Sequence, residues 1–283
     1  MHKALYVVLP VIVLSACHGD APQPRELSGL VVAADGSHYW GHNDGPDYPY
    51  EKDDPTLYLL DRDGKIHQRV ALRGTTNRDW EDIAAFVQNG QRYLVVAETG
   101  DNNSVHEESF LYTVKEPAPG STEVPSERTI SFRFPDHPLD CESVAVDPQT
   151  NSIILVSKRE VPPAVYRLPL DAAPKTLHVA DRIGTIPGLL KASWWERVKN
   201  PWQGPYAAQP TGLDISPDGK VIALQTYKNL YVWHRKGPAL FEGNPTIIPM
   251  PAVDQWEGVA INGNTVVVGK ERGPNLQQFS LTN

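Results

Sequence analysis

The feature that most constrains the fold of this chain is an internal repeat. Five segments share one pattern, in which a polar residue is followed by a small or acidic residue and then by an apolar run. The five polar residues are Ser28, Glu81, Glu142, Thr211 and Glu257. Their spacings of 53, 61, 69 and 46 residues are loose, but each interval contains the same series of segments. Each repeat is therefore expected to be one structural unit that buries its apolar faces against its neighbours.

The series within each repeat is typical of antiparallel strands. A turn rich in Gly, Asn or Pro follows the first apolar run, as in residues 34–37 and 216–219, and these residue types reverse the chain readily. Second apolar runs follow at residues 93–97, 153–157, 221–225 and 265–269. Third runs end the units at residues 57–60, 110–114, 165–168, 230–233 and 276–281, and residues 129–134 and 246–250 could add fourth, outer strands. The β-branched and aromatic content of these runs favours strands.

Small antiparallel units that cannot bury both faces alone gain a core by packing around an axis. The sequence thus predicts an all-β fold, a β-propeller with five blades of three or four strands each. A sixth blade could lie within the irregular stretch 181–209, which contains three tryptophans and a short helical turn at residues 193–200. A β-sandwich with appendages is the alternative architecture. Helical solenoids are excluded, since no long run has a 3.6-residue period.

The first residues have the pattern of an export signal. Lys3 precedes an apolar stretch of 11 residues (4–14), which is too short for a retained membrane helix. The sequence Leu-Ser-Ala-Cys at residues 14–17 resembles the lipobox of bacterial lipoproteins. The resemblance implies removal of residues 1–16 and acylation of Cys17, with residues 17–26 as a lipidated tether and residues 27–283 as one propeller domain.

The same resemblance suggests where the protein resides. His18 follows the lipidated cysteine at a position where Asp would retain a lipoprotein at the inner membrane. We therefore expect attachment to the outer membrane, facing the periplasm, with inner-membrane or cell-surface attachment as alternatives. The formal net charge of −8 argues against a nucleic-acid partner. Cys141, the remaining thiol, cannot form an internal disulfide and is expected to be a small buried residue.

A propeller would bring the repeated polar residues together, because each inner strand begins at the same mouth of the central channel. Glu81, Glu142 and Glu257 would then converge, with Ser28 and Thr211 completing the ring. Converging carboxylates repel each other unless a cation compensates. Ca²⁺ takes six to eight oxygen ligands. A second layer with such oxygen donors follows the second strands and includes Asn43, Asp44, Glu98, Asp101 and Asn102.

Three interpretations of this mouth remain open on sequence alone. The carboxylates could hold a metal ion, or they could pair with basic residues without any metal. These basic residues are Lys158, Arg159, Lys228, Lys270 and Arg272. The third interpretation is a mouth of mixed charge that binds an anionic or sugar-like small molecule. Its candidate ligand-binding residues are Asn43, Asp44, Arg159, Lys228, Lys270 and Arg272.

Several motifs resemble those of a group of secreted bacterial propeller proteins. They are Asp-Trp-Glu-Asp-Ile-Ala (79–84), Gly-Asp-Asn (100–102), Asp-Cys-Glu-Ser-Val-Ala (140–145) and Thr-Gly-Leu-Asp-Ile-Ser-Pro-Asp-Gly (211–219). The likeness covers residues 27–281, and at fold level the group is similar to phytase-like and gluconolactonase/regucalcin-like propellers. What the resemblance implies is metal binding by Glu81, Glu98, Asp101, Asn102, Glu142 and Glu257. The chain departs from the group at Gln225, where an arginine is usual.

Two functions follow from these expectations. The first is a lipid-anchored binding module in the periplasm, containing calcium, which offers its channel mouth to a small molecule or a protein partner. The second is a calcium-dependent hydrolase of phosphate esters or lactones, in which Glu142 or Glu257 acts as general base. The absence of a nucleophile elbow, a Walker loop or a Cys-x-x-Cys pair favours the first. The density of acids at equivalent repeat positions favours the second.

Overall fold

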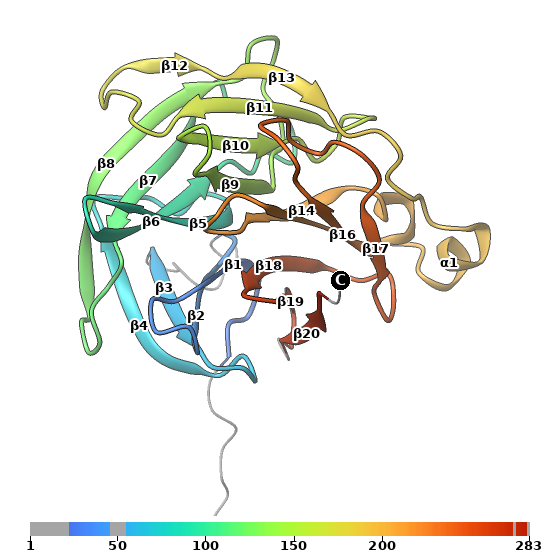
Figure 1. Ribbon diagram of the computed structural model, residues 1–283, viewed down its shortest axis with the longest axis horizontal. Helices are drawn as coiled ribbons and strands as arrows, with labels where there is room; N and C mark the ends of the chain where they lie inside the picture. Colours follow the sequence, from blue (N-terminus) through green and yellow to red (C-terminus); the bar gives the residue numbers. More distant parts are fainter. Residues whose placement is uncertain (1–22, 46–54, 274–275, 282–283) are drawn as a thin grey trace, which may run out of the picture.

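The repeated segments of the sequence form the innermost strands of an all-β fold (Figure 1). The computed structural model describes residues 23–45, 55–273 and 276–281. The inner strands are β1 (Leu27–Val32), β5 (Trp80–Gln88), β9 (Ser143–Asp147), β14 (Pro210–Ile215) and β18 (Trp256–Asn262). Each inner strand contacts the next, and β18 contacts β1. In the described part of the chain these strands therefore form a closed ring, and the predicted all-β class is confirmed.

The first two units join into one large sheet. The first contains β1, β2 (Tyr39–Asn43), β3 (Thr56–Leu60) and β4 (Ile66–Arg73), and the second contains β5, β6 (Gln91–Glu98), β7 (Ser109–Lys115) and β8 (Glu123–Arg133). Within each unit neighbouring strands are antiparallel. The outer strands β4 and β8 pair in parallel. The short strand β12 (Leu177–Val179) also pairs with β8 in parallel.

The remaining units are separate antiparallel sheets of three or four strands, as predicted. The third contains β9, β10 (Ser152–Val156), β11 (Ala164–Pro169) and β13 (Asp181–Thr185). The fourth contains β14, β15 (Val221–Thr226), β16 (Asn229–His234) and β17 (Thr246–Pro249). The fifth contains β18, β19 (Thr265–Lys270) and β20 (Gln277–Ser280). The described arrangement is β-propeller-like.

Apolar side chains fill the spaces between neighbouring units. Between the second and third units, Phe132 and Tyr166 belong to one buried cluster, which also contains Cys141. Between the first and last units, Leu27 and Val267 are fully buried in a cluster of their own. Because burial of apolar surface is the main favourable contribution to folding, this last cluster holds the ring closed.

Two aspartates, the buried Asp82 and the half-buried Asp214, tie the inner strands together. Asp82 Oδ2 accepts hydrogen bonds from the backbone N–H groups of Val144 (2.7 Å) and Leu213 (3.1 Å), so a side chain of β5 connects to β9 and β14. Asp214 Oδ2 accepts from Ile261 N (2.7 Å) and connects β14 to β18. These carboxylates satisfy buried donors that would otherwise lack partners.

One insertion projects from the strands, and we call residues 186–209 the tryptophan flap (Figure 1). It contains α1 (Trp194–Lys199) and the short 3-10 helix η1 (Gly204–Tyr206), and its residues, all of them described, include no strand. The predicted helical turn is present and begins with a capping box between Ser193 and Glu196. None of the described helices is both long and apolar enough to cross a bilayer. The predicted signal (1–16) and Cys17 lie outside the described residues.

Candidate metal centre

The inner strands are irregular where they begin. Three of them have a register shift at the repeated polar position, which leaves Glu81 of β5, Thr211 of β14 and Glu257 of β18 without an opposed residue. Such β-bulges redirect a side chain and occur often beside functional sites. Glu142 immediately precedes β9, in the corresponding place of the third unit. All three glutamates are buried.

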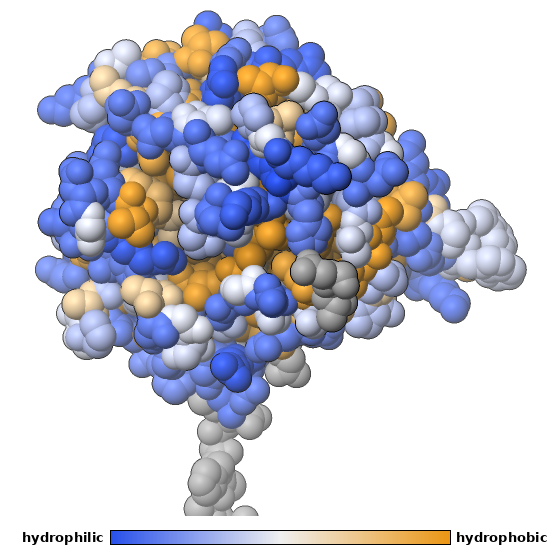
Figure 2. Space-filling view, viewed as in Figure 1, coloured by the Kyte–Doolittle hydropathy of each residue, from blue (hydrophilic) through white to orange (hydrophobic). Residues whose placement is uncertain are grey.

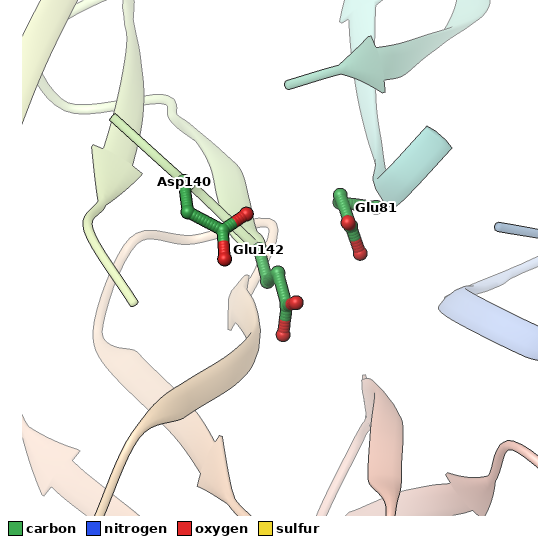
Figure 3. Close-up of side chains that lie close together, drawn as sticks. All are labelled: Glu81, Asp140 and Glu142. Carbon is green, nitrogen blue, oxygen red and sulfur yellow. The ribbon is translucent and has the colours of Figure 1, made fainter. Parts of the chain in front are cut away.

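Three carboxylates from two units converge where the inner strands begin. Glu81, Asp140 and Glu142 each offer an oxygen, and these oxygens lie within 4.8 Å of one another. Figure 3 shows Glu81 facing Asp140 and Glu142 across a common space. Since Ca²⁺ binds oxygen at about 2.3–2.6 Å, oxygens on opposite sides of one ion lie about 5 Å apart. The cluster therefore has donors suited in type and spacing to a hard cation.

One oxygen of this cluster lacks a protein partner. Glu142 Oε2 is buried and accepts no hydrogen bond from the described residues. A buried carboxylate oxygen without a donor is costly, because it has lost its hydration without compensation. A cation at the cluster would remove this cost.

Lys158 supplies one positive charge to the centre. Its ammonium forms a buried ion pair with Glu142 Oε1. The same charge lowers the pKa of Glu81 and of Glu257, although burial outweighs it in both. Lys158 Nζ also lies 5.6 Å from the centre of the Tyr227 ring. Lys158 is thus a well-placed member of the predicted ion-pair network.

Several carboxyl groups around the mouth have raised pKa values. Burial raises the pKa of Glu81 well above its usual value, and the neighbouring charge of Asp79 adds to the effect. Burial, followed by the charge of Glu271, raises the pKa of Glu257 to about 8. Burial likewise raises the pKa of Asp44 to about 7. Each of these groups gains from a proton or a cation near neutral pH.

The backbone passes very close to the centre at Gly100. A Cβ atom there would lie 2.3 Å from Glu81 Oε1 and 2.4 Å from Asp79 Cγ. No side chain can occupy that space without displacing both carboxylates. The glycine of the Gly-Asp-Asn motif is therefore required by the site itself.

The motif residues after Gly100 support Asp140. The N–H of Asp101 donates to Asp140 Oδ1 (3.0 Å), and the Asp101 carboxylate accepts from His106 N (2.7 Å). Asn102 Oδ1 accepts from Arg159, whose Nε also donates to Asp140 Oδ2 (2.8 Å). Asp101 and Asn102, expected as metal ligands, thus have protein partners around the cluster.

Glu98 lies apart from this cluster. Its Oε2 accepts from the hydroxyls of Thr76 and Tyr112, both at 2.8 Å, and its Oε1 is 3.7 Å from Arg78 Nε. Its neighbours belong to a side cavity of about 620 Å³, and no member of the acidic cluster lines that cavity. Among the predicted ligands, the cluster itself contains Glu81 and Glu142.

Most of the predicted ligand-binding residues are engaged with protein groups. Arg159 pairs with Asp140, Lys228 with Glu196 (2.8 Å), Lys270 with Asp254 (2.5 Å) and Arg272 with Glu26 (3.3 Å). Asn43 Oδ1 accepts from Glu26 N (3.3 Å). The remaining predicted residue, Asp44, lies close enough to Glu257 for its charge to raise the pKa of that carboxyl group.

Sequence reasoning missed Asp79 and Asp140 as parts of the site. Both stand two residues before a repeated glutamate, and residues two apart on an extended segment point to the same side. The repeated Asp-x-Glu spacing at 79/81 and 140/142 was the signal that could have found them.

Comparisons with known proteins add little to this geometry. No family model matches the chain. No curated protein matches it either. Many solved chains are similar in structure, and one is hydrazine synthase from Kuenenia stuttgartiensis. That match has a TM-score of 0.45 and 11% sequence identity, and it covers 89% of this chain and 70% of the other. We base no argument on so distant a similarity.

Proposed function

We propose that this chain is a five-bladed β-propeller that binds Ca²⁺ at the mouth where its inner strands begin. The observation that carries the proposal is the convergence of Glu81, Asp140 and Glu142 within 4.8 Å, with Glu142 Oε2 buried and unpartnered among the described residues. The closed ring of inner strands supports five blades, and the tryptophan flap occupies the stretch considered for a sixth.

The donor set favours calcium over zinc. Structural zinc sites are built from cysteine and histidine, and catalytic zinc sites contain at least one of them, whereas the cluster offers three carboxylates. The thiol of Cys141 is buried in apolar surroundings and its pKa is raised by burial, which disfavours a metal-bound thiolate. His42 is buried too, and burial lowers its pKa to about 4. It is not part of the acidic cluster, and its Nδ1 lies within hydrogen-bond distance of Asn43 O (3.0 Å).

In this proposal the protein is a binding module of the periplasm, anchored to the outer membrane through acylated Cys17. Bound calcium would fix the carboxylates of the mouth and present its remaining coordination positions to an acidic or hydroxyl-rich small molecule or to a protein partner. The lipobox supports the anchor, and the scarcity of catalytic motifs in the sequence supports binding rather than turnover.

Thermal unfolding of a chain beginning at Ala21 tests the proposal. Every described strand lies between Leu27 and Ser280, so this chain keeps the whole fold. We expect a lower melting temperature in EGTA than in calcium. At a calcium concentration one hundred times Kd, binding should add about 2.7 kcal/mol to the unfolding free energy.

Two variants assign that effect to the cluster. Glu142→Gln should abolish the calcium shift, because it removes a ligand charge at nearly constant volume. Glu123→Gln is the matched control, since Glu123 is exposed and pairs with Arg73 on an outer strand. An identical calcium shift in wild type and Glu142→Gln would exclude this site.

The second candidate function is a metal-dependent hydrolase. It is favoured by Glu257, whose pKa of about 8 suits proton transfer near neutral pH and whose Oε1 lies 3.4 Å from the Tyr227 hydroxyl. Bound calcium would supply Lewis acidity. A screen of phosphate esters and lactones should then show turnover that Glu142→Gln or Glu257→Gln removes. Calcium binding without turnover would contradict the hydrolase and agree with the binding module.

A further inference from the structure

The tryptophan flap exposes an unusual amount of aromatic surface. Trp194, Trp195 and Trp202 are 65%, 67% and 79% exposed, and Val198 and Tyr206 are exposed as well. No residue of α1 is buried. In Figures 1 and 2 the helix stands clear of the body of the molecule. Large exposed apolar side chains gathered in one place mark an interaction surface.

Polar contacts nevertheless hold the flap in place. Lys228 Nζ donates to Glu196 (2.8 Å) and to the backbone oxygen of Lys191 (3.2 Å), and Asn200 Nδ2 donates to Val253 O (2.7 Å). These partners fix both ends of α1, one to a loop of the fourth unit and the other to the connection between the fourth and fifth units. The fold thus presents the tryptophans on a fixed support without burying them.

The charge of the flap is opposite to that of the whole chain. Its basic residues Lys191, Arg197 and Lys199 outnumber its one acid, Glu196, which gives a net charge of +2, whereas the chain carries −8. Glu196 is moreover paired with Lys228. Tryptophan and tyrosine concentrate at the interface between membrane and water, and nearby Lys or Arg are attracted to anionic headgroups.

The flap and the start of the fold border the same mouth. The chain enters β1 where Asp44 N donates to Glu26 O (3.1 Å) and Leu27 N donates to Glu271 O (3.0 Å). The charges of Asp44 and Glu271 raise the pKa of Glu257 at the mouth. The flap is tied to Lys228, which follows the mouth residue Tyr227, and to Val253, whose neighbour Asp254 donates its N–H to Tyr227 O (3.1 Å). The described chain therefore begins its first strand on the side of the ring that carries the flap.

We propose that the tryptophan flap inserts into the headgroup region of an anionic lipid bilayer. The flap would act as a second contact beside the acylated terminus, and stable membrane association commonly requires two such signals. The inference shares only the membrane location with the proposed function. It needs no metal, so the two can fail separately.

The test is flotation of the chain beginning at Ala21, in EGTA, with vesicles of phosphatidylethanolamine and phosphatidylglycerol. We expect binding and a blue shift of tryptophan emission. The triple variant Trp194→Ala, Trp195→Ala, Trp202→Ala should reduce partitioning at least about tenfold, because it removes the inserting side chains. It should melt like wild type, because these side chains are exposed.

Two further variants make the result specific. Exchange of Lys191, Arg197 and Lys199 for Gln should weaken binding to anionic vesicles and leave binding to phosphatidylcholine vesicles unchanged. Val87→Ser is the control, since Val87 is 64% exposed at the opposite end of β5 from Glu81, and it should change nothing. The proposal is overturned if wild type does not float, if the triple variant floats equally, or if flap fluorescence responds to soluble oligosaccharides but not to vesicles.

Discussion

Replacement of Lys158 by methionine separates the metal and ion-pair interpretations of the mouth. The lysine and Glu142 side chains are only 8% and 5% exposed, so their ion pair is buried. Removal of one partner of a buried pair costs about 3–5 kcal/mol, because the other charge remains without compensation. The loss should be larger here than at a surface pair, since the same ammonium also lowers the pKa of Glu81 and Glu257.

Calcium should reverse much of this loss. At an effective dielectric constant near 20, two unit charges about 4 Å apart interact by about 4 kcal/mol. Lys158 therefore repels a cation at the cluster, and relief of even half of that energy raises affinity more than tenfold. We expect Lys158→Met to bind calcium at least about tenfold more tightly than wild type, although it is less stable in EGTA.

The assay combines urea unfolding, with and without calcium, and calorimetric titration of the metal. The control is Lys220→Met, because Lys220 pairs with Asp218 at the surface, where both side chains are more than half exposed. Its cost should stay below about 1 kcal/mol and should not depend on calcium. An equal loss for Lys158→Met in both conditions, with unchanged or weaker calcium affinity, would refute the reasoning and favour a metal-free ion-pair network.

Three other predictions follow from the same geometry. Burial raises the pKa of Glu257 to about 8 in the folded protein, so the unfolding free energy without metal should fall between about pH 4.5 and 8, by up to about 1.4 kcal/mol per pH unit. Calcium affinity should rise over the same pH range, and calorimetry in different buffers should detect the protons that binding releases. A calcium affinity that does not change with pH would contradict this. Gly100→Ala should abolish calcium binding in the same titration by displacing Glu81, while Gly184→Ala, whose added Cβ meets no atom within 4 Å, should bind normally. Asp82→Ala should lower the unfolding free energy by about 3–5 kcal/mol, because several buried N–H groups lose their acceptor; a urea titration measures the loss, and stability near wild type would show that these bonds contribute little.

The inner strands could be predicted from the sequence because each carries its own signal. Residues 27–32 have the polar residue and apolar run of the repeat, and β1 occupies that same range. The strand β13 was assigned to an irregular stretch, since all five of its residues are exposed and no alternation of polar and apolar residues marks it. The parallel pairing of β4 with β8 depends on where two distant edges meet, for which a single sequence has no local pattern.

The site was predictable to the extent that the repeat governs it. Equivalence in the repeat identified Glu81 and Glu142, because equivalent residues of a ring of units lie at the same height along the axis. It could not identify the partners of Glu98, which ends the second strand of its unit and accepts hydrogen bonds from Thr76 and Tyr112. Such contacts depend on side-chain rotamers and loop conformations, which a single sequence does not specify.

The charge balance at the mouth explains why the metal and ion-pair interpretations were hard to separate. Of the five basic residues considered for a network, Lys158 and Arg159 pair with carboxylates of the acidic cluster, Glu142 and Asp140. Lys228 and Lys270 pair with Glu196 and Asp254, and Arg272 pairs with Glu26 and Glu271. The described carboxylates around the mouth therefore outnumber the cations that reach them, and this deficit adds to the burial that raises their pKa values. Protons can cover it at low pH. These protons are lost as the pH rises, the one on Glu257 at about pH 8, and a divalent cation between Glu81 and Glu142 would then supply two positive charges at once.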